Sequence, residues 1–170
     1  MEALQAILTR RSIRKYKKDP VDDSTIRKVL ECGFAAPTAK NRKPLHYIVI
    51  KDRDVLSRLG SMHMYAGMVE GSAFSILVCG DYALEDRRQF IDQDGGAACE
   101  NMLVGANAMG LGGVWCGVPE GGEREDAIRK ICRIPPGITP VALLAFGVPD
   151  EVKETLDRYD ASRVREDVWE

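Results

Sequence analysis

The residues best suited to chemistry in this chain gather in one short stretch, Arg10-Arg11-Ser12-Ile13-Arg14-Lys15-Tyr16. Three guanidinium groups and a hydroxyl lie close together in it. Arginine side chains match the oxygens of a phosphate with paired hydrogen bonds, and a serine hydroxyl adds a donor at short range. The stretch is therefore suited to hold a phosphate monoester, although a basic run of this kind is also typical of a solvated helix end.

Two further segments offer binding groups rather than acids and bases: the loop 37–41 and the stretch 115–118. They supply small residues and backbone amides. No pair of carboxylates and no Cys/His pair forms an evident acid–base couple, so we assign no catalytic residue. Cys116 has no redox partner nearby in the sequence and is interpreted as a buried thiol. If the chain is an enzyme, we expect a bound cofactor to carry the reaction.

Several common site signatures are absent from the sequence. There is no Gly-x-x-x-x-Gly-Lys phosphate loop and no Gly-x-Ser-x-Gly nucleophile elbow. The stretch Gly110-Leu111-Gly112-Gly113-Val114-Trp115 begins like a dinucleotide fingerprint, but Trp115 stands where the third glycine belongs. It also follows a predicted helix and precedes a predicted strand, which is the reverse of the order that the fingerprint needs. We therefore exclude a Rossmann site.

The composition is that of a soluble globular protein of 170 residues, with a formal net charge of −2. This charge argues against general nucleic-acid binding, which depends on neutralising many phosphates. No apolar run is long enough to span a membrane and no signal peptide is evident, so we expect a cytoplasmic protein. The five cysteines are widely spaced and only two histidines are present, so we predict no metal site.

The elements that must position these residues follow from the hydrophobic pattern. We expect helices at residues 1–9, 24–34, 52–59, 62–69, 88–109 and 124–132. We expect strands at residues 45–51, 74–80, 114–118 and 141–147. Asp22, Asp23 and Ser24 offer N-caps for the second helix. Because the chain contains no internal repeat and no linker, the pattern predicts one domain of mixed helix and strand spanning residues 1–170.

The predicted helix at residues 88–109 is apolar around almost its whole circumference in its second half. Such a helix is buried in a large core or in an oligomer, and a domain of this size has limited interior. We therefore expect part of it to form a subunit interface. The highly charged segment 158–170 offers little to a core, and we expect it either to wrap a neighbouring molecule or to fray.

Three motifs, in order, resemble those of the nitroreductase family of flavoproteins. They are the stretch 10–16, the stretch Ala36-Pro37-Thr38-Ala39-Lys40-Asn41-Arg42-Lys43-Pro44, and the stretch Gly110-Leu111-Gly112-Gly113-Val114-Trp115-Cys116-Gly117. Residues 135–147 look like the closing strand of the family. Arg158-Tyr159-Asp160, together with Trp169, is similar to the tail of its short members. The resemblance covers nearly the full chain, with one departure at Lys43, where the family more often has glutamine.

The resemblance implies an α+β domain with a central mixed, mostly antiparallel sheet flanked by helices, in an intertwined homodimer with one FMN at each end of the interface. The residues implied to hold the FMN phosphate and ribityl chain are Arg10, Arg11, Ser12 and Arg14. Those implied to lie beside the isoalloxazine, from the partner subunit, are Pro37, Thr38, Ala39 and Asn41. Trp115, Cys116 and Gly117 would lie near the ring, with a backbone amide toward N5, and Arg158 would reach the phosphate.

The activity implied by the resemblance is that of an NAD(P)H-dependent flavin oxidoreductase. Electrons would pass in a ping-pong cycle from NADH or NADPH, through flavin N5, to a flat acceptor such as a nitroaromatic or a quinone. Two alternatives stay open. One is a non-enzymatic module that binds a phosphate or a nucleotide, and the other is a flavoprotein that receives electrons from a protein donor. Bound flavin separates the first alternative from the enzyme, because the module would be colourless.

Overall fold

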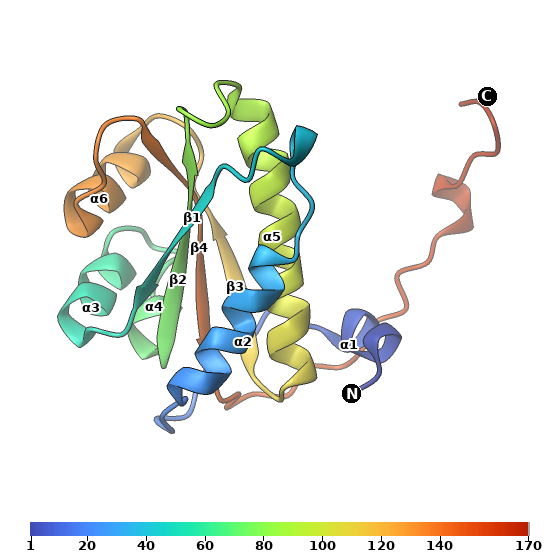
Figure 1. The fold of residues 1–170 in the computed structure, drawn as a ribbon. Coiled ribbons are helices and arrows are strands. Elements are labelled where there is room, and N and C mark those ends of the chain that lie inside the picture. Colours follow the sequence, from blue (N-terminus) through green and yellow to red (C-terminus); the bar gives the residue numbers. More distant parts are fainter. Residues whose placement is uncertain (170) are drawn as a thin grey trace.

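A four-stranded antiparallel sheet forms the centre of the computed structural model, which describes residues 1–169 (Figure 1). The strands are β1 (Leu45–Ile50), β2 (Phe74–Asp81), β3 (Gly112–Gly117) and β4 (Ile138–Gly147), in the order β1-β2-β4-β3. The two central strands, β2 and β4, are buried along almost their whole length. Continuous apolar runs are expected for strands that are covered on both faces, which explains why these segments show no polar alternation.

Helices cover both faces of this sheet (Figure 1). On one face lie α2 (Asp23–Phe34) and α5 (Arg88–Ala108), which pack around a core that contains Phe74, Phe146 and Met102. On the other face lie α3 (Arg53–Ser61), α4 (Met68–Gly71) and α6 (Glu123–Cys132), around Leu56, Leu77 and Leu143. The remaining helices are α1 (Ala3–Thr9), which contacts α5, and two short 3-10 turns, η1 (Ala39–Asn41) and η2 (Ala161–Arg163). This arrangement confirms the predicted α+β class.

Most predicted elements are present, and three predictions were wrong in their extent. Strand β4 begins at Ile138 rather than at residue 141, because a register shift opposite Val78 and Cys79 accommodates Pro140 within the pairing. Strand β3 begins at Gly112 rather than at residue 114. A Cβ atom at Gly113 would lie 2.8 Å from Leu103 and Phe146, so glycine is needed there inside a strand. The predicted helix at 62–69 is absent over residues 62–67, and the short helix α4 shares only its last two residues.

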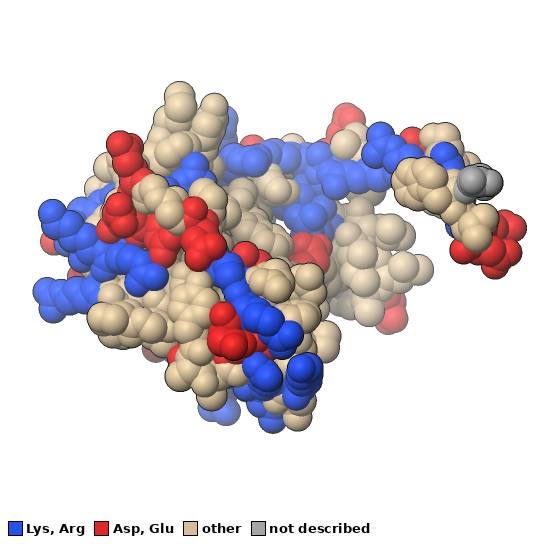
Figure 2. Space-filling model, turned by 90° about the horizontal axis from the view of Figure 1, so that it is seen from above, with Lys and Arg blue, Asp and Glu red and all other residues tan. Residues whose placement is uncertain are grey.

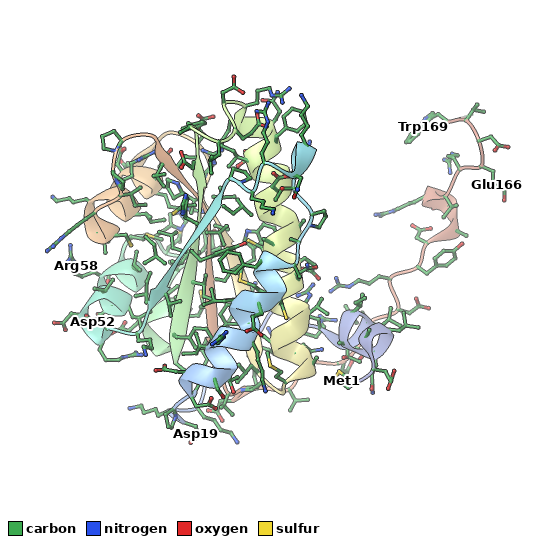
Figure 3. All side chains as sticks on the ribbon, viewed as in Figure 1. Met1, Asp19, Asp52, Arg58, Glu166 and Trp169 are labelled. Carbon is green, nitrogen blue, oxygen red and sulfur yellow. The ribbon has the colours of Figure 1, made fainter. Side chains whose placement is uncertain are left out.

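The ends of the chain lie outside the layered body. Helix α1 exposes Leu4, Ile7 and Leu8, and beyond residue 153 the chain runs away from the sheet as an exposed segment (Figure 1). Glu166 and Trp169 lie toward the far end of this segment (Figure 3). Along the part of the chain that the structure describes, no helix is long and apolar enough to cross a membrane.

Candidate functional site

The arginine stretch runs along the open edge of β3 rather than forming a helix end. Helix α1 stops at Thr9, and Ser12 forms a parallel bridge with Gly113. The amide of Ile13 donates to the carbonyl of Gly113 over 3.0 Å. Tyr16 forms a second bridge, with Pro149, and its hydroxyl donates to the carbonyl of Ile13 over 2.6 Å. The backbone therefore fixes the stretch to the sheet independently of its cationic side chains.

A carboxylate from the end of the fold holds the same stretch from its other side. Glu151 Oε1 accepts the amides of Arg14 and Lys15, over 2.5 and 3.2 Å. The hydrogen bond from the amide of Arg14 is the main reason that the pKa of Glu151 lies below its usual value. Lys153 Nζ donates to the carbonyl of Ser12 over 2.7 Å. Because Glu151 binds the backbone of Arg14, it does not neutralise the guanidinium of that residue.

Most of the predicted site residues are distributed over three cavities, whereas Ser12 and Ala39 line none of the three. The Arg14 cavity, about 420 Å³, is lined by Arg14, residues 114–117 of β3, the stretch 62–68 and Arg124. The Arg11 cavity, about 390 Å³, lies between α1 and the tail and brings Arg10, Arg11 and Arg158 together. The loop cavity, about 240 Å³, is lined by Pro37, Thr38 and Asn41 with Phe34 and Tyr47. Figure 2 shows basic side chains gathered where the tail leaves the body.

The three cations of the Arg11 cavity are not equivalent. Arg10 Nε forms an ion pair with Glu100 Oε1 over 2.9 Å. Arg11 Nη1 is buried and, among residues 1–169, has no hydrogen-bond partner. A buried guanidinium nitrogen without an acceptor is costly, and an anion that binds there would relieve the cost. Arg158 is exposed on the tail. The cavity therefore has donor capacity that the chain itself leaves unused.

Strand β3 forms a wall of the Arg14 cavity. Its side chains alternate between the two faces of the sheet, so Trp115 and Cys116, which were both predicted to lie near the ring, lie on opposite faces. The Trp115 side chain lies toward α5, where it approaches Gly96, whereas the thiol of Cys116 lies 3.9 Å from Met68 Sδ on the opposite face. Burial raises the pKa of Cys116, and the charges of Arg124 and Arg14 only partly offset this effect. The thiol is therefore protonated near neutral pH. A Cβ atom at Gly117 would meet no other atom within 4 Å, so the wall is open there.

The loop that contains Pro37, Thr38, Ala39 and Asn41 is strained and firmly anchored. Lys40, Asn41 and Lys43 adopt left-handed backbone angles, with φ of 52°, 54° and 53°. Residues other than glycine keep such angles only where the surroundings fix them, and they are frequent at functional sites. Thr38 Oγ1 accepts the amide of Lys43 over 3.0 Å, and Asp94 Oδ1 accepts the amide of Ala39 over 2.9 Å.

A second anchor of this loop is the buried carboxylate of Glu85. Arg42 Nη1 lies 3.0 Å from Glu85 Oε2, and Arg87 Nε lies 2.9 Å from Glu85 Oε1. The Glu85 side chain has no exposed surface. The hydrogen bond from Arg87 is the main cause that lowers the pKa of Glu85 to about 2. A carboxylate that is kept ionised between two arginines therefore fixes the end of the loop.

Several residues of these cavities carry no recognisable signal in the sequence. Arg124 is one of many charged residues on α6, and His63 and Tyr65 fall in a stretch that was predicted to be helical. Asp94 and Glu85 look like surface acids because the loop groups that they anchor, the amide of Ala39 and the side chain of Arg42, lie far away along the chain. Only the pairing of distant segments brings them to the site.

An α+β domain of this kind is shared with proteins of known family. The model of the nitroreductase family matches residues 7–64 and 61–148. The chain belongs to the nitroreductase family, as its motifs predicted. A relative from Methanothermobacter thermautotrophicus, described as an NADH dehydrogenase/NAD(P)H nitroreductase, is 37% identical over 169 residues, which are 99% of this chain and 88% of the relative.

Solved structures agree with this assignment. A protein from Parabacteroides distasonis, also described as an NADH dehydrogenase/NAD(P)H nitroreductase, superposes with a TM-score of 0.93 at 32% identity and covers 98% of both chains. A protein from Desulfovibrio desulfuricans, described as a nitroreductase and solved in complex with FMN, superposes with a TM-score of 0.85 at 31% identity. The superposition covers 100% of this chain and 99% of that one.

Proposed function

We propose that this chain transfers electrons in a ping-pong cycle from NADH or NADPH, through bound FMN, to a flat acceptor such as a nitroaromatic or a quinone. The chain is an NAD(P)H-dependent flavin oxidoreductase, and FMN is its cofactor. This assignment is supported by its family, by relatives described as NAD(P)H nitroreductases, and by the FMN complex of the Desulfovibrio desulfuricans protein. FMN, when bound, supplies the redox chemistry by accepting a hydride and passing on its electrons.

The residues present fit this cofactor. Arg11 Nη1, which is buried and has no hydrogen-bond partner among residues 1–169, is suited to a phosphate oxygen. Arg10 and Arg158 line the same cavity, and Ser12 follows Arg11 directly in the chain. The Arg14 cavity combines a guanidinium with the open wall at Gly117, where a flat ring system has room to lie. Negative charge that develops on such a ring is stabilised by a cation held at its edge. The observation that carries the proposal is the Arg14 cavity, which is lined by cations and, among residues 1–169, by no acidic residue and lies beside the edge strand β3.

We infer that residues 1–170 form one FMN-binding domain that works as a homodimer. Within the single chain, the loop cavity and the Arg14 cavity have no lining residue in common. A second subunit would bring Pro37, Thr38, Ala39 and Asn41 to the cofactor. The exposed surface fits such an association, because an apolar hollow of about 410 Å³ lies over α5 beside Val104, and Ile7 of α1 lines it. Joining two such faces would remove this apolar area from water.

The visible absorbance spectrum of the purified protein tests the proposed function. Flavin bands are expected, and they should bleach when NADH or NADPH is added without oxygen. Flavin bands that do not bleach would indicate a flavoprotein with another electron donor, such as a protein. A colourless protein that also fails to take up added FMN would refute the cofactor and favour a phosphate- or nucleotide-binding module.

A further inference from the structure

We propose that Arg124 is a specificity residue that binds an anionic group on the flat substrate entering the Arg14 cavity. The proposal rests on the function proposed above and narrows its substrate class to compounds that carry a negative charge. Arg124 lies outside the three sequence motifs, in the first turn of α6. It lines the Arg14 cavity together with Gly117, seven residues earlier in the chain.

Arg124 is held in place by a backbone carbonyl and by the ring of His63. Its Nη1 donates to the carbonyl of Gly117 over 2.7 Å. Its Nη2 lies 3.2 Å from Nδ1 and 3.0 Å from Nε2 of His63. The amide of Tyr65 donates to Nδ1 of the same ring over 3.1 Å, which fixes the ring beside Arg124. The guanidinium is thus oriented at the cavity without losing its charge.

No carboxylate compensates this charge. Within residues 1–169, Arg124 forms no ion pair, and none of the residues that line the Arg14 cavity is acidic. The buried acid on the same helix turn, Glu125, is occupied by Arg129 over 2.8 Å and by the amide of Gly121 over 2.7 Å. A guanidinium has five N–H donors, so Arg124 retains donors for an incoming oxygen anion after its bonds to Gly117 and His63.

The rest of the cavity favours an apolar and flat body attached to that anion. Met62, Met64 and Met68 line it, together with the ring of Tyr65. Methionine side chains adapt to the shape of a ligand and make favourable contacts with aromatic rings. A ligand that combines an aromatic body with an oxygen anion fits this cavity, because the body would contact these residues and the anion would bind Arg124. Two sources supply this chemistry: a carboxylate on the electron acceptor, and the pyrophosphate of the nicotinamide dinucleotide.

The test compares FMN-loaded wild-type protein with Arg124→Gln, Arg124→Lys and the control Lys130→Gln. Lys130 is exposed on the same helix and does not line the cavity, so its replacement removes one positive charge elsewhere. Three quantities are measured for each protein: kcat/KM for 4-nitrobenzoate and for the neutral 4-nitrobenzamide, KM for NADH, and the Kd of FMN. The Kd of benzoate for the oxidised protein, read from the shift of the flavin bands, is measured without turnover.

The loss of one charge-assisted hydrogen bond is expected to reduce the preference for 4-nitrobenzoate over 4-nitrobenzamide about tenfold in Arg124→Gln. Benzoate binding should weaken by the same factor, whereas Arg124→Lys should retain most of the preference and Lys130→Gln all of it. If the anion belongs to the dinucleotide, KM for NADH rises instead and the acceptor preference is unchanged. That outcome would support the anion-binding role of Arg124 and would show that the bound anion belongs to the electron donor.

Two results would overturn the proposal. One is an equal loss of activity on both nitro compounds with a raised Kd for FMN, which would place Arg124 in the flavin site. The other is no change in the acceptor preference, in benzoate binding or in KM for NADH. The flavin spectrum of every variant is recorded first, so a failure of the proposed function, a colourless protein, is recognised separately from a failure of the role of Arg124.

Discussion

The backbone amide of Ala39 donates a hydrogen bond of 2.9 Å to the buried carboxylate of Asp94, although 55 residues separate the two along the chain. The other oxygen of this carboxylate, Oδ2, is buried and has no partner within residues 1–169. Asp94 lies on α5, which packs against the sheet, and Ala39 lies in the loop with left-handed backbone angles. A helix of the sheet-packing layer thus fixes the conformation of the strained loop that we propose to contact the cofactor.

Replacing Asp94 by alanine is expected to loosen this loop. The amide of Ala39 would lose its acceptor, which costs about 1–3 kcal/mol for a buried donor. We expect a lower free energy of unfolding and a weaker affinity for FMN, whereas Asp94→Asn, which retains an acceptor oxygen, should affect both less. Urea denaturation and FMN titration measure the two quantities. An unchanged FMN affinity in Asp94→Ala would show that the loop does not depend on this anchor.

Glu85 gives the protein a stability that depends on pH in the acid range. Its pKa falls from the usual 4.5 to about 2 in the folded protein, mainly through the hydrogen bond from Arg87. The unfolded chain therefore takes up the proton first, so the contribution of Glu85 is present above pH 4.5 and is lost as the pH falls towards 2. The urea midpoint should decrease as the pH is lowered through this range. The decrease should be less steep for Glu85→Gln than for wild type. Equal slopes would contradict this assignment.

The variant Arg11→Gln distinguishes the contribution of Arg11 to FMN affinity from its contribution to the stability of the FMN-free protein. Because Arg11 Nη1 is buried and has no hydrogen-bond partner in the described part of the chain, 1–169, its removal should leave the stability of the FMN-free protein unchanged or slightly higher. The affinity for FMN should fall about tenfold or more, since a charge-assisted bond to phosphate is lost. Fluorescence titration with FMN and thermal unfolding of the FMN-free protein provide the two readings. Lys18→Gln, which removes an exposed positive charge outside the Arg11 cavity, serves as the control.

A charge placed on the outer face of α5 should disrupt the proposed homodimer. Val104 lines the apolar hollow over this helix, and Val104→Asp would place an unpaired carboxylate in the interface. Light scattering should give twice the chain mass of 18.8 kDa for wild type and a single chain mass for the variant. Leu84→Glu, at an exposed position that does not line this hollow, should remain dimeric. A monomeric wild-type protein would refute the dimer.

The sequence by itself determined the elements and the motifs of this protein. The periodicity of Ile26, Val29 and Leu30 defines α2, and the continuous apolar run at residues 74–80 defines β2, because burial of a helix face or a strand leaves a local pattern. The order of the motifs was enough to predict the family. The extent of β3 and β4 could not be read in this way, since Gly112, Gly113 and Pro140 are tolerated in strands only through contacts with distant segments.

Only the tertiary structure decided how the site is assembled. In the folded chain, Arg14, Arg124 and His63 line one cavity, whereas residues of the loop 37–41 line another. The tertiary structure also turned two apparent surface acids, Glu85 and Asp94, into buried anchors. The physical reason is that hydrophobic periodicity depends on neighbours along the chain, whereas the pairing and burial of a charge depend on residues that meet only when the sheet and its helices have packed.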